Sequence, residues 1–145
     1  MIIGVFLRNL KTYTGINYIP LTNGHSFCGL VGNNGIGKSS VLESLDCLLN
    51  NKTWNYNVVV KKSGMATTKP HIVPVYLLSS DKVSTKNAEI AKKISDYTWY
   101  VEDSDIIPQN RVHFKTFREQ RDLLKRSYNT EKWLLIPLGL SYESV

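Results

Sequence analysis

Residues 32–39 read GNNGIGKS, and they constrain this chain more than any other segment because they match the phosphate-binding loop pattern GxxxxGK[ST] in full. The glycines of such a loop permit positive backbone dihedral angles, so main-chain N–H groups can point inward around phosphate oxygens. The pattern assigns the amino group of Lys38 to the β- and γ-phosphates and the hydroxyl of Ser39 to Mg²⁺. The octet therefore predicts a site for a nucleoside triphosphate.

The residues on both sides of the octet favour a strand, loop and helix in that order. Residues 26–31 are mostly apolar and predict a short buried strand. A helix is expected to begin near Lys38 and to stop at Asn50 and Asn51. Its apolar positions are Val41, Leu42, Leu45, Leu48 and Leu49, with Glu43 and Asp46 on the wetter side. The predicted phosphate-binding residues are Gly32, Asn33, Asn34, Gly35, Ile36, Gly37, Lys38, Ser39 and Ser40.

Composition limits the remaining possibilities. With 145 residues, of which 42% are hydrophobic and 21% charged, the chain is expected to form one globular domain with its own core. No apolar run approaches the roughly 18 residues that span a bilayer, and the N-terminus lacks the features of a signal peptide. We therefore expect a cytoplasmic protein without a membrane partner. Cys28 and Cys47 are interpreted as small core residues rather than a disulfide or redox pair.

The net charge of +6 is unevenly distributed. Residues 1–72 carry seven Lys or Arg and two Asp or Glu, and several of the lysines follow the loop helix. These are Lys52, Lys61, Lys62 and Lys69. Two interpretations stay open, a patch that holds nucleic-acid phosphates and a solvated loop, the second being favoured because no base-reading element is evident. Trp54 and Tyr56 could stack on adenine, although packing is the preferred interpretation.

The rest of the sequence predicts further strands and helices. Strands are expected at 1–8, 18–21, 72–78 and 133–138, with Pro74 indicating an edge or an irregular strand. A helix over 85–101 is predicted from Ala88, Ala91, Ile94 and Tyr97, and another over 111–128 from Phe114, Phe117, Leu124 and Tyr128. Residues 108–110 break the chain between them. The histidines His25, His71 and His113 are too scattered to predict a zinc site.

These elements predict an α/β fold, a P-loop NTPase-like sheet with flanking helices. We expect a single domain over 1–145, with a nucleotide-binding lobe over 1–80 and a mostly helical extension over 81–145 that ends in a strand.

Two segments resemble a known group of proteins. LRNLKTY at 7–13 and LVGNNGIGKSSVLESL at 30–45 are similar to the N-terminal part of the ABC-type ATPase heads of RecF, OLD-family nucleases and structural-maintenance-of-chromosomes proteins, with Leu10 in place of an aromatic residue. The resemblance covers about the first 50 residues. It implies ATP at 32–40, Mg²⁺ at Ser39, and ATP-driven pairing with a second ATPase head, coupled to DNA or to a nuclease partner. DNA repair, DNA maintenance or anti-phage defence would be the setting.

Other parts of such a head are not found in the sequence. A signature motif is missing, and the nearest Walker B candidate, residues 99–103, has its acidic pair in reversed order at the end of a helical pattern. We interpret it as a helix end followed by an acidic loop through Asp105, and Gln109 as a turn residue rather than a metal-sensing glutamine. The chain is therefore expected to be an incomplete ABC-type head in which Lys38 is the catalytic-site lysine and ATP hydrolysis is slow or absent.

Alternatives come from other classes. A GTPase would need an Asn-Lys-x-Asp motif, and the string at 51–54 lacks the aspartate. A small-molecule kinase could use Arg118 and Arg121 as lid arginines, although Arg111, Lys115, Arg118 and Lys125 also fit the wet face of an amphipathic helix. A non-catalytic nucleotide-sensing or interaction module is the remaining alternative.

Overall fold

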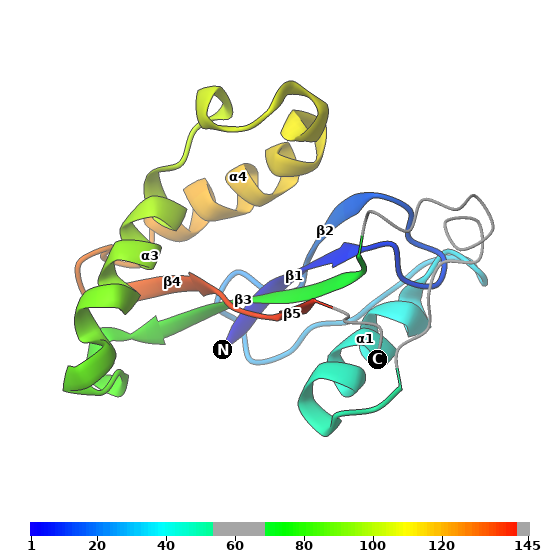
Figure 1. Cartoon of the computed structure of the whole chain (residues 1–145), viewed down its shortest axis with the longest axis horizontal. Coiled ribbons are helices and arrows are strands. Elements are labelled where there is room, and N and C mark those ends of the chain that lie inside the picture. The colour runs from blue at the N-terminus through cyan, green and yellow to red at the C-terminus, as the bar shows by residue number, and fades with distance from the viewer. Residues whose placement is uncertain (54–68, 142–145) are drawn as a thin grey trace.

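The computed structural model describes residues 1–53 and 69–141, and within them five strands form one antiparallel sheet (Figure 1). The order of the main strands is β2-β1-β3-β4, and β5 pairs with β3 beyond the end of β4. The strands are β1 (Ile2–Arg8), β2 (Ile16–Pro20), β3 (His71–Ser79), β4 (Trp133–Pro137) and β5 (Leu140–Ser141). All four longer strands fall where the sequence predicts them.

Helices cover both faces of the sheet, which gives the mixed α/β architecture that the sequence predicts (Figure 1). On one face lie α3 (Ala88–Tyr100) and α4 (Arg111–Lys125), packed through Trp99, Phe117 and Leu124. On the other face lies α1 (Lys38–Asn50), packed through Val41 against Val5, Leu7 and Ile72. A register shift between Ile2 and Gly4 lets Ile3 and Val5 enter different cores.

Pro74 lies inside the sheet, so the edge-strand alternative is wrong. Strand β3 has β1 on one side and β4 and β5 on the other. Pro74 lies opposite the break between β4 and β5, where the N–H of Leu138 donates to its carbonyl oxygen at 3.1 Å. A residue without an N–H is tolerated there because the partner strand is itself interrupted.

The predicted strand at residues 26–31 does not form. The segment has no regular secondary structure, and the side chains of Phe27 and Val31 are 84% and 92% exposed. No strand of the described sheet pairs with it, so its backbone gains no ladder hydrogen bonds. The expectation that Cys28 is a core residue is therefore wrong, since Cys28 is exposed, while Cys47 is half-buried.

The buried faces of two helices differ from those that the apolar spacing predicts. In α3, Ile94 and Tyr97 are exposed and Ser95, Thr98 and Trp99 are buried. Ser95 is accommodated because its hydroxyl accepts a hydrogen bond from the N–H of Leu135 at 2.9 Å. In α1, Val41 is buried and Leu45 and Leu48 pack partly buried against the core, as predicted. Leu42 and Leu49 are exposed, and Ser40 and Ser44 are buried in addition. Small hydroxyl residues thus face the sheet and allow the helices to approach it closely.

The remaining predictions concern residues 108–110, helix α4 and the aromatic and basic residues after α1. Residues 108–110 form a 3₁₀ turn before α4, and Phe114, Phe117 and Leu124 are buried on that helix as predicted. Trp54, Tyr56, Lys61 and Lys62 lie outside the described residues.

Candidate phosphate-binding site

The loop before α1 has the backbone conformation that its glycines permit. Gly35 and Gly37 have φ angles of 84° and 101°, in the left-handed region that other residues rarely adopt. A Cβ atom on Gly37 would lie 2.8 Å from the Thr12 hydroxyl and 3.0 Å from the Tyr13 hydroxyl. Gly37 is therefore required both for its backbone conformation and for the close approach of the loop between β1 and β2.

The N-terminus of α1 is open to a ligand. Its N-cap residue is Gly37, which has no side chain to cap the helix, and its first turn carries no acidic residue. The first intrahelical hydrogen bond is donated by the N–H of Val41 to the carbonyl oxygen of Gly37 at 3.2 Å. The N–H groups of residues 38–40 therefore lack the intrahelical partners that later residues have. Unsatisfied N–H groups at the positive end of a helix favour an anion such as a phosphate.

Lys38 folds back over the same loop. Its Nζ atom donates to the carbonyl oxygens of Gly32 at 2.5 Å and Asn33 at 2.6 Å. The side chain thus reaches from the first turn of α1 back to the first residues of the loop. The ammonium group and the open N–H groups therefore belong to one continuous loop and helix start, as the pattern for binding one anion requires.

The predicted phosphate-binding residues form a continuous loop and helix start. Asn33, Asn34, Gly35 and Ser39 are exposed, and the Ile36 side chain is 57% exposed. Ser40 is buried, and its hydroxyl oxygen lies 3.5 Å from the hydroxyl oxygen of Thr12. Ser39 therefore presents its hydroxyl to solvent near the loop, while Ser40 packs against the protein and offers only its backbone.

The loop between β1 and β2 braces this site, a role that the sequence motifs do not predict. Besides the Thr12 contact, the Tyr13 hydroxyl donates to the carbonyl oxygen of Gly37 at 3.3 Å, and Lys11 forms an ion pair with Glu43 of α1. Burial raises the pKa of Tyr13, which keeps this phenol a donor. In the sequence, this brace corresponds to the LRNLKTY segment at residues 7–13. The resemblance of that segment to ATPase heads assigns no physical role to its side chains.

The brace is itself held by Asn9, a buried residue with a φ angle of 52°. Its side-chain carbonyl oxygen accepts a hydrogen bond from the N–H of Gly15 at 2.8 Å, and its own N–H bonds the Gly15 carbonyl oxygen at 3.3 Å. Asparagine tolerates this left-handed conformation better than most residues. The turn is thereby closed, and Thr12 and Tyr13 are presented to α1.

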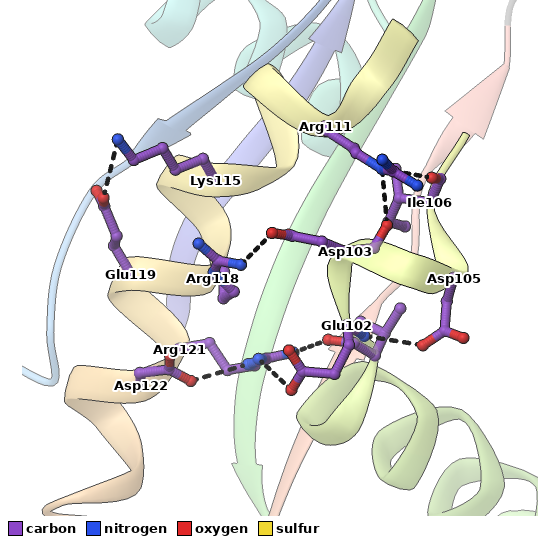
Figure 2. Close-up of polar contacts among 11 residues, drawn as sticks. Glu102, Asp103, Asp105, Ile106, Arg111, Lys115, Arg118, Glu119, Arg121 and Asp122 are labelled. Atoms are coloured by element: carbon purple, nitrogen blue, oxygen red, sulfur yellow. Dashed lines mark hydrogen bonds and ion pairs between the residues drawn. The ribbon is translucent and has the colours of Figure 1, made fainter. Parts of the chain in front are cut away.

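The acidic residues of the Walker B candidate follow α3, which packs on the opposite face of the sheet from α1, and Figure 2 shows their contacts with arginines of α4. Helix α3 ends at Tyr100 and a 3₁₀ turn follows over Asp103–Asp105, as the preferred interpretation predicts. Asp103 pairs with Arg118. Glu102 lies 3.4 Å from Arg121, whose side chain is 1% exposed. These carboxylates hold α4 in place rather than facing the phosphate-binding loop.

Figure 2 also shows contacts of the candidate lid arginines, Arg118 and Arg121, and of Arg111 on the same helix. The guanidinium of Arg121 donates to the carbonyl oxygen of Val101, and that of Arg111 donates to the carbonyl oxygens of Asp103 and Ile106, at 2.9 and 3.2 Å. Arg118 and Arg121 are therefore directed into the acidic loop, and neither is positioned to close over a phosphate at residues 32–40.

Other charged groups near the helix are also paired. Lys52 donates to Asp46 at 2.5 Å, and this hydrogen bond holds the pKa of the Asp46 carboxyl below its ordinary value.

Within residues 1–53 and 69–141, no cluster of three or more His, Cys, Asp or Glu side chains is arranged to hold a metal ion. No helix in the described part of the chain has the length and apolar character to cross a membrane.

Comparison with known proteins identifies one match. A family described as "AAA ATPase domain" matches residues 1–136, which include the loop, its brace, both helical layers and β4. No curated protein and no solved structure matches the chain.

Proposed function

The chain belongs to the AAA ATPase domain family and is an ATP-binding module of the ATPase type, and we propose that residues 32–40 hold the triphosphate. The observation that carries this proposal is that Lys38 bonds back to Gly32 and Asn33 of the loop and that the same loop leads into the uncapped start of α1. The site residues are Gly32, Asn33, Asn34, Gly35, Ile36, Gly37, Lys38, Ser39 and Ser40.

The proposed binding uses groups that this loop already presents. Phosphate oxygens accept hydrogen bonds from the N–H groups at residues 38–40, which have no acceptor in the helix. The Lys38 ammonium group exchanges the carbonyl oxygens of Gly32 and Asn33 for the β- and γ-phosphates, a stronger charge-assisted contact. Ser39 is the side chain that would hold Mg²⁺, since its hydroxyl is exposed beside the loop. When bound, Mg²⁺ neutralises phosphate charge.

Hydrolysis needs groups that the described residues do not bring to the loop. Glu43, on α1, is paired with Lys11, and Glu102 and Asp103 are paired with arginines on the opposite face. Without a carboxylate to orient the attacking water, positioning of the nucleophile is lost. We therefore propose that this chain binds ATP and turns it over slowly alone, and that a second ATPase head or a nuclease partner completes the catalytic site.

The biological role that we propose follows from the resemblance to RecF, OLD-family and structural-maintenance-of-chromosomes proteins. We propose that ATP binding is coupled to DNA in repair, maintenance or anti-phage defence, in the cytoplasm. The excess of Lys and Arg in residues 1–72 supports a nucleic-acid partner. Lys69 is exposed and fits such a role, whereas Lys52 is engaged by Asp46.

A non-catalytic nucleotide-sensing module is the second candidate, and it is favoured by the pairing of Glu102 and Asp103 away from the loop. The kinase alternative loses support because Arg118 and Arg121 are engaged in the acidic loop.

Nucleotide binding and phosphate release, measured on the same preparation, separate these functions. We expect saturable ATP binding in the presence of Mg²⁺ with little phosphate release, and faster release when the completing partner is added. Binding that no partner converts into hydrolysis would favour the sensing module. Turnover by the isolated chain at the rate of a complete ATPase would contradict the need for a partner, and transfer of phosphate to a small acceptor would favour a kinase.

A further inference from the structure

A cavity lies on the opposite side of the sheet from the phosphate-binding loop. This cavity, of about 360 Å³, separates the sheet from α3, α4 and the turn between them. In Figure 1 the ribbon of α4 lies farther from the sheet at its N-terminal end than at its C-terminal end. The sheet contributes Phe6, Ile16 and Val73, and α4 contributes Phe114 and Phe117. This volume lies within the range of pockets that bind small molecules.

The cavity is mostly apolar, and three of the residues that line it have basic side chains. Arg8 of β1 and His71 of β3 line it, as does His113 of α4, and its lining residues include no Asp or Glu. The register of the sheet places Arg8 directly opposite His71. No carboxylate in the described part of the chain lies within ion-pairing distance of Arg8, in contrast to Arg118 and Arg121.

Among residues 1–53 and 69–141, no carboxylate compensates the positive charge of Arg8. Basic groups directly opposite one another on adjacent strands repel. Burial, followed by the charges of Arg8 and Lys69, lowers the pKa of His71, so the charged form of this imidazole is disfavoured beside Arg8. A bound anion would offset this repulsion, while an apolar group in the body of the cavity would displace water from aromatic surface.

We propose that this cavity binds a small amphipathic carboxylic acid. Its apolar chain or ring lies among Phe6, Val73, Phe114 and Phe117, and its carboxylate lies at Arg8 and the two histidines. The planar guanidinium of Arg8 is suited to a carboxylate because it can donate two parallel hydrogen bonds. The apolar lining selects against small hydrophilic anions, and the guanidinium of Arg8 favours an acid over a neutral apolar molecule.

The proposal is independent of the nucleotide assignment. The cavity is lined from the sheet face that carries α3 and α4, whereas α1 and its loop pack on the other face. A variant that loses nucleotide binding at Lys38 should therefore keep the acid site, so that failure of one assignment does not imply failure of the other.

Titration of the full chain with octanoate and with octanol, followed by isothermal calorimetry and methyl NMR, tests the proposal. We expect octanoate to bind saturably at one site, to shift the methyl signals of Ile16 and Val73, and to bind more tightly than octanol. Lys38→Ala should leave octanoate binding unchanged. Absence of saturable octanoate binding, or shifts confined to other residues, would overturn the site.

Two variants separate charge recognition from cavity filling. Arg8→Gln should weaken octanoate binding by about tenfold, because a charge-assisted contact is lost, and should change octanol binding by less than about threefold. Val73→Phe should reduce binding of both, because the ring fills the cavity. Arg126→Gln is the matched control, since Arg126 is exposed and outside the lining. Equal affinity of the unchanged chain for octanoate and octanol, or equal weakening by Arg8→Gln and Arg126→Gln, would overturn acid recognition.

Discussion

The phenol of Tyr13, on the loop between β1 and β2, donates a hydrogen bond to the carbonyl oxygen of Gly37 at the start of α1. The sheet and the phosphate-binding loop are joined by this contact and by the ion pair between Lys11 and Glu43. The conformation of Gly37 sets where the open N–H groups of the helix point. A segment 24 residues earlier in the sequence therefore contributes to the shape of the site.

Tyr13→Phe should weaken ATP binding while leaving the fold intact. The change removes one neutral hydrogen bond and keeps the ring, so we expect an affinity about threefold to tenfold lower, measured by titration with a fluorescent ATP analogue. Tyr76→Phe is the control, because Tyr76 lies on β3 and has no described bond to the loop. Equal affinities for Tyr13→Phe and the unchanged chain would show that this contact does not shape the site.

Arg121→Ala should be strongly destabilising. The buried guanidinium donates to the Val101 carbonyl oxygen and lies 5.9 Å from the centre of the Phe114 ring, so its removal leaves an unpaired acceptor and a cavity. We expect a free energy of unfolding lower by about 2–4 kcal/mol, measured by urea denaturation.

Lys115→Ala is the matched change on the same helix. Lys115 forms an exposed pair with Glu119 at 3.8 Å, and such pairs contribute at most about 0.5 kcal/mol. A similar loss of stability in both variants would contradict the structural role assigned to Arg121.

The stability of the chain should fall in alkaline solution, in part because of Tyr18. Its buried phenol donates to the side-chain carbonyl of Gln120, and burial raises its pKa well above the usual range. In the unfolded chain the same group ionises near pH 10, so the unfolded state binds fewer protons above that pH. The stabilisation from neutral Tyr18 is therefore complete below pH 10 and is lost as the pH rises further.

Tyr18→Phe should remove this part of the alkaline loss. At neutral pH the variant should be less stable by about 1–2 kcal/mol, because the Gln120 acceptor loses its donor. Urea denaturation should be measured between about pH 8 and 11, a range that spans the reference pKa of tyrosine. The free energy of unfolding should decline less steeply with pH for the variant than for the unchanged chain. Parallel declines for the two proteins would contradict the role of Tyr18.

Local patterns predicted most of the elements but not which surfaces they bury. The long strands and helices are visible as apolar runs and helical spacing because those periods follow from backbone geometry. The prediction of the buried face of α3 was wrong because Ser95 and Thr98 are buried there. The hydroxyl of Thr98 donates to a backbone carbonyl oxygen and that of Ser95 accepts from a backbone N–H, so apolar character alone does not identify the face toward the sheet. Residues 26–31 have strand composition, but a strand also requires a partner.

The candidate site was more predictable than its support. The phosphate-binding loop is encoded in eight consecutive residues, because each of its groups comes from one local turn. The brace from Thr12 and Tyr13 depends on the closure of the turn at Asn9 and Gly15, and on α1 lying across β1. Such long-range contacts leave no periodic signal in a single sequence.

The central claim is that residues 32–40 bind ATP through Lys38, and the affinity of Lys38→Ala for ATP with Mg²⁺ tests it most directly. We expect the unchanged chain to bind ATP saturably and Lys38→Ala to bind at least about tenfold more weakly, since a charge-assisted contact to phosphate is lost. Lys52→Ala, which removes an exposed lysine just after the same helix, should bind like the unchanged chain. Equal affinity of Lys38→Ala and the unchanged chain would contradict the account.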